Sequence, residues 1–158
     1  MVTLPGYKKM SSVFNSELEL SLRILLTLYT SSKALNEDEI VLTDFITVYS
    51  HEFGLSKHSL HGNNEFSFSE FAARRAQFHS ALKELVINSY VKVNTDANGF
   101  TYQPTELGES VCDSMSTSYA DIYIDNSYLA IDYIKDKSTT ELFSYINKMA
   151  LISNDQEA

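Results

Sequence analysis

The sequence predicts a mainly α-helical protein with a small β-hairpin, in which a winged helix-turn-helix-like core is followed by a C-terminal helical extension. Three observations support this fold class. Apolar residues recur at helical spacing through most of the chain. Residues 90–103 alternate like two strands joined by a turn. Three predicted helices precede this hairpin and another follows it, which is the order expected of a winged helix.

The first predicted helix begins where Ser16 and Glu19 have the spacing of a capping box, in which each side chain satisfies a free N–H group of the first turn. Its apolar residues form two stripes on different faces, and one stripe consists of Leu20, Ile24 and Leu28. A helix that is apolar on two faces is either buried between layers or covered by a partner. We therefore place it in the centre of the core and also expect this stripe to contact a partner protein.

Two more helices precede the hairpin. The first is predicted over residues 37–51, with Gly54 as a left-handed cap, and residues 55–66 are predicted to form an irregular loop. The second starts at a capping box formed by Ser67 and Glu70 and is long enough to reach the hairpin.

The hairpin and the last third of the chain follow. Gly99 closes the predicted turn because glycine adopts a positive φ without strain. Residues 105–135 form either one helix of about 45 Å or two helices that meet near residues 125–127, since Asp, Asn and Ser favour caps over helix interiors. Ser138 and Glu141 form a third capping box, which starts a final helix.

These elements divide the chain into two predicted parts. A winged-helix-like core spans residues 13–104, and a helical extension over residues 105–152 packs on the core and on partners. Residues 1–12 and 153–158 are predicted to be flexible ends.

The composition indicates a folded protein in a reducing compartment. Of 158 residues, 44% are hydrophobic and 21% are charged, which suits one domain with a substantial core. No apolar run approaches the roughly 20 residues of a membrane span, and the first residues lack the apolar centre of a secretory signal. The single cysteine, Cys112, excludes an internal disulfide. We expect a cytoplasmic protein that does not enter a membrane.

The net charge of −9 is unevenly distributed. Residues 1–99 contain eleven acids and nine bases, which leaves −2, whereas residues 100–158 contain ten acids and three bases, which leaves −7. The C-terminal part should therefore repel a phosphate backbone and would suit a basic protein surface. Solubility alone is the alternative explanation of this charge.

No residue pattern indicates catalysis or cofactor binding. His58 and His61 have a spacing that a metal could use, but zinc sites usually show ligand pairs in two places, and Glu65 is the only nearby carboxylate. Cys112 follows no strand-to-helix elbow, and neither glycine-rich phosphate motif is present. We predict that the protein is not an enzyme and has no catalytic residue, metal or cofactor.

In a DNA-binding winged helix the third helix enters the major groove. Here the exposed face of that helix carries only Lys83 and Glu84 among small and polar residues, with Arg74 and Arg75 at the edges of the apolar face. Such a face reads bases and phosphates poorly. We expect little or no direct DNA binding by this chain alone, and we expect the arginines to pack beside the core, pair with carboxylates or meet a partner.

Ten tyrosines, nine phenylalanines and two-faced helices exceed what one small core comfortably buries. Tyrosine suits interfaces because it has an apolar body and a polar tip. A large core with tyrosines at its rim is the alternative. The residues that we predict to bind partners are Leu20, Ile24, Leu28, His58, Leu60, His61, Arg74, Arg75, Tyr119, Tyr123, Tyr128 and Phe143.

The sequence resembles the middle components of bacterial ABC-three-component systems over about residues 13–130. Four segments carry the resemblance in the same order as in that family: VFNSELELSLRIL at residues 13–25, Ser59-Leu-His61, the Arg74-Arg75 pair, and YQPTELG at residues 102–108.

This resemblance implies a small winged-helix-like subunit that works beside an SMC-like ATPase and a nuclease effector, as in Lamassu-type anti-phage and anti-plasmid defence systems. It implies no catalytic residue. The expected function is a non-catalytic adaptor that links the ATPase heads to the effector within a hetero-oligomer. A stand-alone dimeric winged-helix transcriptional regulator is the alternative, and a small enzyme is a third reading.

Overall fold

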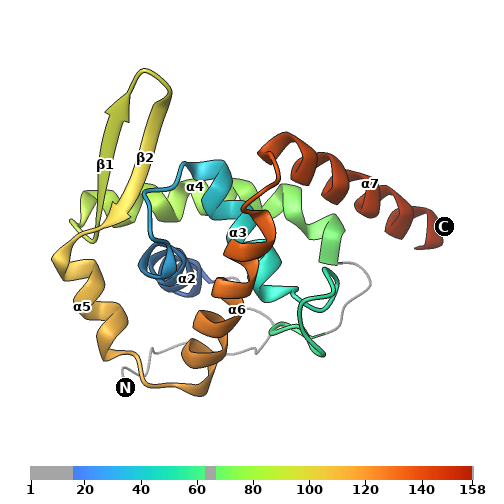
Figure 1. Cartoon of the computed structure of the whole chain (residues 1–158), viewed down its shortest axis with the longest axis horizontal. Coiled ribbons are helices and arrows are strands. Elements are labelled where there is room, and N and C mark those ends of the chain that lie inside the picture. The colour runs from blue at the N-terminus through green and yellow to red at the C-terminus, as the bar shows by residue number, and fades with distance from the viewer. Residues whose placement is uncertain (1–15, 63–66, 158) are drawn as a thin grey trace.

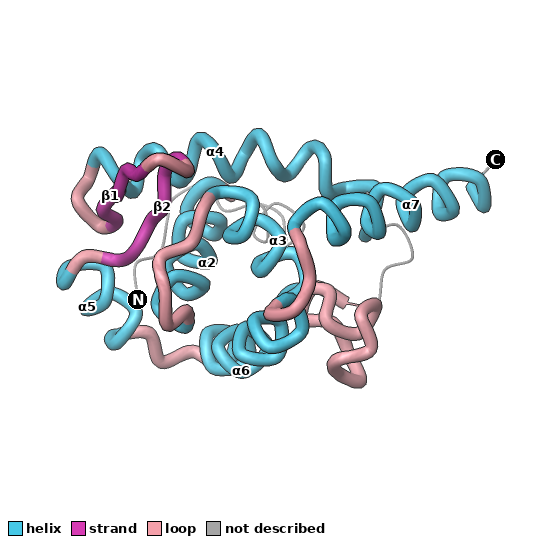
Figure 2. Tube along the Cα trace, turned by 45° about the horizontal axis from the view of Figure 1, so that its top comes forward, coloured by secondary structure: helices cyan, strands magenta, loops and turns pink. Residues whose placement is uncertain are grey.

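The computed structural model describes residues 16–62 and 67–157, and the mainly helical fold with one hairpin is confirmed (Figure 1, Figure 2). The order of helices and hairpin is compatible with a winged helix. The elements of these residues are α2 (Glu17–Thr30), α3 (Glu37–Val48), the 3₁₀ turn η1 (Ser67–Glu70), α4 (Phe71–Ile87), β1 (Val91–Asp96), β2 (Gly99–Pro104), α5 (Glu106–Ser114), α6 (Ser118–Ile134) and α7 (Thr139–Glu157).

The two ends that we predict to be flexible differ in what the structure describes. Residues 1–12 lie outside the described part of the chain. Helix α7 continues to Glu157, so the backbone of most of the segment 153–158 is helical. The division into two parts at residues 104 and 105 stays a prediction.

Helix α2 occupies the centre of the molecule, where α3, α4, α5, α6 and the hairpin surround it (Figure 1). Ser16 caps its first turn by accepting a hydrogen bond from the backbone N–H of Glu19, as the spacing predicts. The side chains of Leu20, Ile24 and Leu28 are buried by other parts of the same chain, whereas Leu18 and Tyr29 on the other apolar face of α2 are exposed. The expected partner is therefore not needed to cover this stripe.

A buried ion pair joins α2 to α3. The Arg23 guanidinium donates from Nε to Oδ1 of Asp44 over 2.8 Å and from Nη2 to Oδ2 over 2.6 Å. Tyr123 of α6 donates its hydroxyl to the same Oδ1 over 2.6 Å, and its oxygen lies 2.7 Å from Oγ1 of Thr27. All of these side chains are buried, so the network ties three helices together inside the core.

Charge holds this network in its ionised form. Burial alone would raise the pKa of Asp44, but the Arg23 guanidinium and the hydrogen bonds from Arg23 and Tyr123 hold that pKa below its usual value of 3.8. Burial and the neighbouring Asp44 carboxylate raise the pKa of Tyr123 well above 10.0, so the phenol remains a donor. The pair is therefore charged at neutral pH.

Several helix ends differ from the sequence predictions. Helix α3 ends at Val48 rather than near residue 51, although Gly54 does have a positive φ of 73° in the following turn. Residues 67–70, where the sequence predicts a capping box, form a 3₁₀ turn, and α4 begins after it at Phe71. The Ser67 side chain lies outside the described part of the structure, so the capping box itself stays a prediction. A capping box that the sequence analysis did not identify, between Asn36 and Glu39, starts α3.

Neither alternative for residues 105–135, one continuous helix or a break near residues 125–127, matches the structure. The chain breaks earlier, where α5 ends at Ser114 and Thr117 caps α6 by accepting from the N–H of Ala120 over 3.1 Å. Asn126 and Ser127 lie inside α6, where both are buried. Their polar groups are satisfied by other helices: Ser127 Oγ lies 2.6 Å from Thr30 Oγ1, and Asn126 donates to Ser50 Oγ.

The hairpin is fixed to the helices at two points. Gly99 has a φ of 116°, which confirms the predicted turn residue. Leu35, in the connector between α2 and α3, exchanges backbone hydrogen bonds of 3.0 and 2.8 Å with Tyr102 of β2. At the other end of β2, Gly108 of α5 packs so closely that an added Cβ would lie 2.2 Å from the carbonyl oxygen of Tyr90.

An aromatic cluster attaches α7 to the rest of the molecule. Phe45, Phe53, Phe68 and Phe71 are buried and pack ring to ring, with Phe45 at distances of 5.0–6.0 Å from the other three. Phe143 and Tyr145 of α7 contact this cluster, and Ser138 caps α7 as predicted. Much of the aromatic surplus in the sequence is therefore used inside the chain.

We predict that Asp44→Asn strongly destabilises the protein, because it leaves the buried Arg23 guanidinium without a counter-ion. The free energy of unfolding should fall by about 3–5 kcal/mol. Asp38→Asn is a matched control, since Asp38 pairs with Arg75 at the surface, and it should cost at most about 1 kcal/mol. Urea denaturation followed by circular dichroism measures both, and equal losses would contradict the assignment.

We predict that Gly108→Ala separates α5 from the base of the hairpin, because its methyl group would overlap the Tyr90 carbonyl. The expected loss in the free energy of unfolding is about 1–3 kcal/mol. Glu109→Ala, at the next and exposed position of α5, should leave stability nearly unchanged. Thermal denaturation of the two variants tests this, and similar melting temperatures for both would show that the close approach is dispensable.

Candidate partner-binding surfaces

The structure places five of the twelve predicted partner-binding residues in the core, where other parts of the same chain cover them. Leu20, Ile24, Leu28 and Tyr123 are at most 2% exposed, and Arg74 is 3% exposed. The four apolar or aromatic side chains fill the space between α2, its neighbours and α6. Helical spacing alone could not separate burial within the chain from burial by a partner.

The two arginines of α4 have different environments. Arg74 is buried, donates to the hydroxyl of Tyr49 over 3.2 Å and lies 3.3 Å from a Glu70 carboxylate oxygen. Arg75 is half exposed, pairs with Asp38 over 2.9 Å and lies 4.4 Å from the ring centroid of Phe143. The arginines therefore tie α4 to α3, η1 and α7, and they form no bare positive ridge.

His61 and Tyr119 meet at the edge of the core. His61 Nε2 lies 2.7 Å from the Tyr119 hydroxyl, and the two rings stack at a centroid distance of 6.0 Å. Tyr119 in turn stacks on Tyr123, and Tyr49 packs its ring edge-on against His61. Burial, helped by the positive charge of Arg23, lowers the pKa of His61 from 6.5 to about 3, so the imidazole is neutral in the folded protein.

The remaining predicted residues are at or near the surface. Leu60 and Phe143 are half-buried and pack against the core. His58 is exposed in the loop after α3, and Tyr128 of α6 is 55% exposed. Together with Arg75, these two residues are the predicted contacts that the folded chain leaves accessible.

The exposed face of α4 matches the helical analysis. Ala73, Ala76, Gln77, Ser80, Lys83 and Glu84 are all exposed. One lysine beside one glutamate gives this face no net charge, and the two arginines point to other elements. This face of α4 therefore offers one basic side chain, Lys83, where major-groove binding uses several.

The described residues also show how reactive groups are placed. Within residues 16–62 and 67–157, no three His, Cys, Asp or Glu side chains are grouped as metal ligands. Burial, with smaller contributions from Asp113 and Glu109, raises the pKa of the Cys112 thiol to about 12. The Cys112 side chain is buried on α5. None of the described helices combines the length and hydropathy needed to cross a membrane.

Exposed large apolar side chains outside the predicted contacts occur on several elements of the described residues. Five of them lie on α2, α5 and α6: Leu18, Tyr29, Leu107, Ile122 and Leu129. Six others form two groups. The hairpin group consists of Ile87 at the end of α4, Val93 of β1 and Phe100 of β2, which are 63%, 37% and 61% exposed. Val93 and Phe100 share one face of the hairpin, because Val93 pairs with Tyr102 and Phe100 with Thr95. The alternation along the strands was the signal that could have identified this face.

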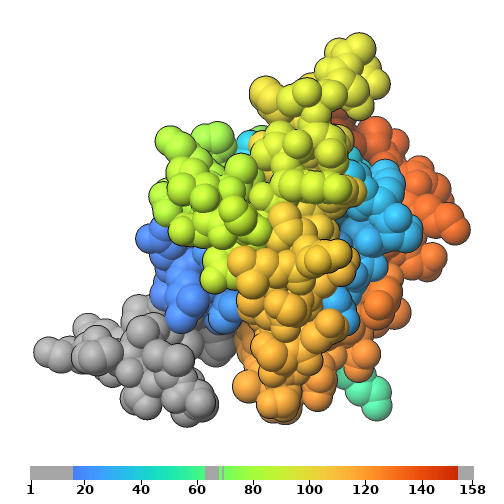
Figure 3. All heavy atoms as spheres, turned by 90° about the vertical axis from the view of Figure 1, so that its left-hand side faces the viewer, coloured from blue at the N-terminus to red at the C-terminus, as the bar shows by residue number. Residues whose placement is uncertain are grey.

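The second group, the α7 group, consists of Tyr145, Leu151 and Ile152, which are 39%, 65% and 42% exposed. The hairpin and the distal end of α7 lie at opposite ends of the molecule (Figure 1). Figure 3 shows that the hairpin also projects beyond the body formed by the helices. These two exposed apolar surfaces are therefore well separated on the molecule.

We predict that His61 makes folding sensitive to mildly acidic pH. The unfolded histidine binds a proton as the pH falls below 6.5, whereas the folded one resists protonation down to about 3, so stability is lost as pH falls through this window. The free energy of unfolding should drop less between about pH 7.5 and about pH 5 in His61→Gln than in the unmodified chain. His58→Gln, at an exposed position, is the control, and an identical drop in all three proteins would refute the assignment.

Comparison with known proteins identifies the family. No curated protein and no solved structure shows a significant match to the chain. The family model described as ABC-three component (ABC-3C) system Middle Component 2 matches residues 13–156, which extends the resemblance seen in the sequence into the final helix. Because this match covers nearly the whole chain, the protein belongs to the Middle Component 2 family of ABC-three component systems.

Proposed function

We propose that this chain is a non-catalytic adaptor that links an SMC-like ATPase to a nuclease effector in a Lamassu-type defence complex. Membership of the Middle Component 2 family makes the chain a defence-system subunit that works with partner proteins. The observation that carries the adaptor role is the separation of two exposed apolar surfaces, the hairpin group and the α7 group. A subunit that bridges two proteins needs one surface for each.

The way in which the two groups are attached to the core supports a separate binding surface for each partner. Val93 and Phe100 lie on a projecting hairpin that the Leu35 bridge and the close approach of Gly108 hold in place, and Ile87 lies at the adjoining end of α4. Leu151 and Ile152 lie on a helix whose first half is anchored by the aromatic cluster. Each surface is thus rigidly connected to the core, and a partner bound at one end has a fixed orientation relative to the other.

We predict that each surface retains a different partner. The chain is to be co-expressed with the proteins encoded beside its gene and captured through an affinity tag. Ile87→Ser with Phe100→Ser, and Leu151→Ser with Ile152→Ser, should each weaken the capture of one partner about tenfold or more and leave the other bound. Quantitative mass spectrometry of the captured complexes measures the retention.

Asn94→Ala and Lys148→Ala are the matched controls, because the first lies on the opposite face of the hairpin and the second is an exposed polar position of α7. Both controls should retain both partners. Recovery of the unmodified chain only as a free monomer would refute the adaptor role. Loss of both partners from either surface variant, with unchanged melting temperature, would show that the two surfaces serve one partner.

A further inference from the structure

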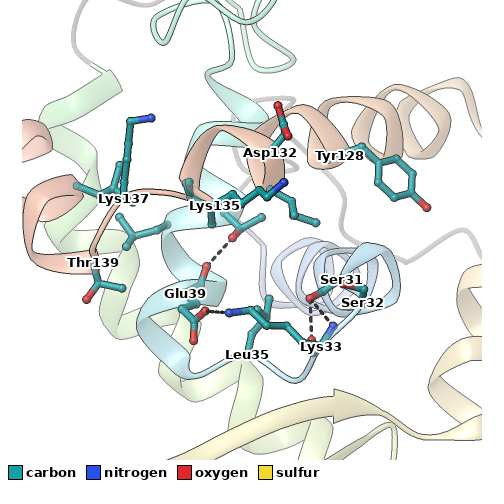
Figure 4. Close-up of a pocket in the computed structure, with 15 residues that line it drawn as sticks. Ser31, Ser32, Lys33, Leu35, Glu39, Tyr128, Asp132, Lys135, Lys137 and Thr139 are labelled. Atoms are coloured by element: carbon teal, nitrogen blue, oxygen red, sulfur yellow. Dashed lines mark hydrogen bonds and ion pairs between the residues drawn. The ribbon is translucent and has the colours of Figure 1, made fainter.

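A third surface feature is a groove on the side of the molecule between the hairpin and α7. The connector after α2, the first turns of α3, the end of α6 and the start of α7 border a hollow of about 580 Å³ (Figure 4). We name it the lysine groove, after Lys33 of the connector that follows α2 and Lys135 and Lys137 of the turn between α6 and α7.

The floor of the lysine groove is apolar. Leu35, Leu42 and Leu142 are buried beneath it, and Ile131 and Ile134 of α6 are half-buried in its wall. Tyr128, one of the residues predicted to bind a partner, extends the apolar lining where it is 55% exposed. A ligand in this groove would therefore bury apolar side chains that now face water.

The net charge of the residues that line the groove is opposite in sign to the net charge of the whole chain. Three lysines and two carboxylates line the groove, which leaves +1, whereas the chain carries −9. Of the three bases in residues 100–158, two are at this groove. The local surplus of lysines favours an acidic ligand.

Two of the lysines have structural roles within the chain. Lys33 lies 3.2 Å from a carboxylate oxygen of Glu39, and Lys137 donates to the carbonyl oxygen of Tyr133 over 2.8 Å, where it satisfies the last turn of α6. Lys135 is exposed at the end of the same helix, and its ammonium group has no hydrogen bond or ion pair with the described residues. The Lys137 ammonium group therefore has a structural role in the last turn of α6, whereas the Lys135 ammonium group has none among the described residues.

We infer that the lysine groove binds an acidic segment of a partner protein, which places apolar side chains on the floor and a carboxylate against Lys135. This inference rests on the proposed adaptor function and names the chemistry of one contact. The charged groups lie on an exposed rim, with the Lys33 side chain 72% exposed, which is the arrangement of a protein interface. A buried small-molecule site would instead direct buried polar groups into the cavity.

A carbodiimide cross-linker tests this chemistry directly, because it joins a lysine amine to a carboxylate in contact with it. It is to be applied to the complex of the full chain captured with its co-expressed partners. Mass spectrometry should identify a bond between Lys135 and an aspartate or glutamate of a partner, within a segment that also contains apolar residues.

Two variants and two controls complete the experiment. Lys135→Glu should weaken retention of the cross-linked partner about tenfold, as expected for reversing one charge of a close pair. Tyr128→Ala should act in the same direction through lost apolar contact. Lys148→Glu, on α7, and Leu129→Ala, an exposed apolar residue of α6, lie outside the groove lining and should retain the partner.

The outcomes separate this inference from the proposed function. A complex that forms and keeps its partners in Lys135→Glu and Tyr128→Ala, with no cross-link at Lys135, overturns the groove assignment and leaves the adaptor role standing. A cross-link between Lys135 and a second copy of this chain overturns the partner segment as occupant. Failure of the unmodified chain to form any complex overturns both.

Discussion

The buried pair of Arg23 and Asp44 is the interaction on which the rest of the structure depends. Two charges inside a core are costly to desolvate, and they are tolerated here because the guanidinium and the carboxylate meet in a fork with two short hydrogen bonds. Tyr123 adds a third bond from α6. The pair thus fixes the positions of α2, α3 and α6, which border the groove and support the hairpin.

Local signals in the sequence predicted the elements whose ends depend on neighbouring residues. The caps at Ser16 and Ser138 and the turn at Gly99 are set by hydrogen bonds or dihedral angles within a few residues, and all three are confirmed. Two local caps are absent from the sequence predictions, the capping box of Asn36 and Glu39 and the Thr117 cap of α6. The interior of α6 depends instead on contacts between distant segments. Asn126 and Ser127 favour caps in isolation, but their bonds to Ser50 and Thr30 make them interior residues of α6.

The sequence also does not show which predicted partner-binding residues are accessible and which are buried, because burial depends on contacts between distant segments. The stripe of Leu20, Ile24 and Leu28 is apolar whether another helix or another protein covers it, and its sequence carries no information about which. Tyr128 was selected for its residue type, and the structure leaves it exposed beside the lysine groove. For Val93 and Phe100 the alternation along the strands is a signal in the sequence, and the pairing of β1 with β2 shows that they share one face.

The bridge between Leu35 and Tyr102 has a mechanical consequence. Two backbone hydrogen bonds of 3.0 and 2.8 Å join the hairpin to the short connector that also carries Lys33. The connector can extend very little, because α2 ends and α3 begins only a few residues to either side of the bridge. We therefore expect a force that tilts the hairpin to be transmitted to the edge of the lysine groove. The strength of binding in the groove then depends on the force that a partner applies to the hairpin.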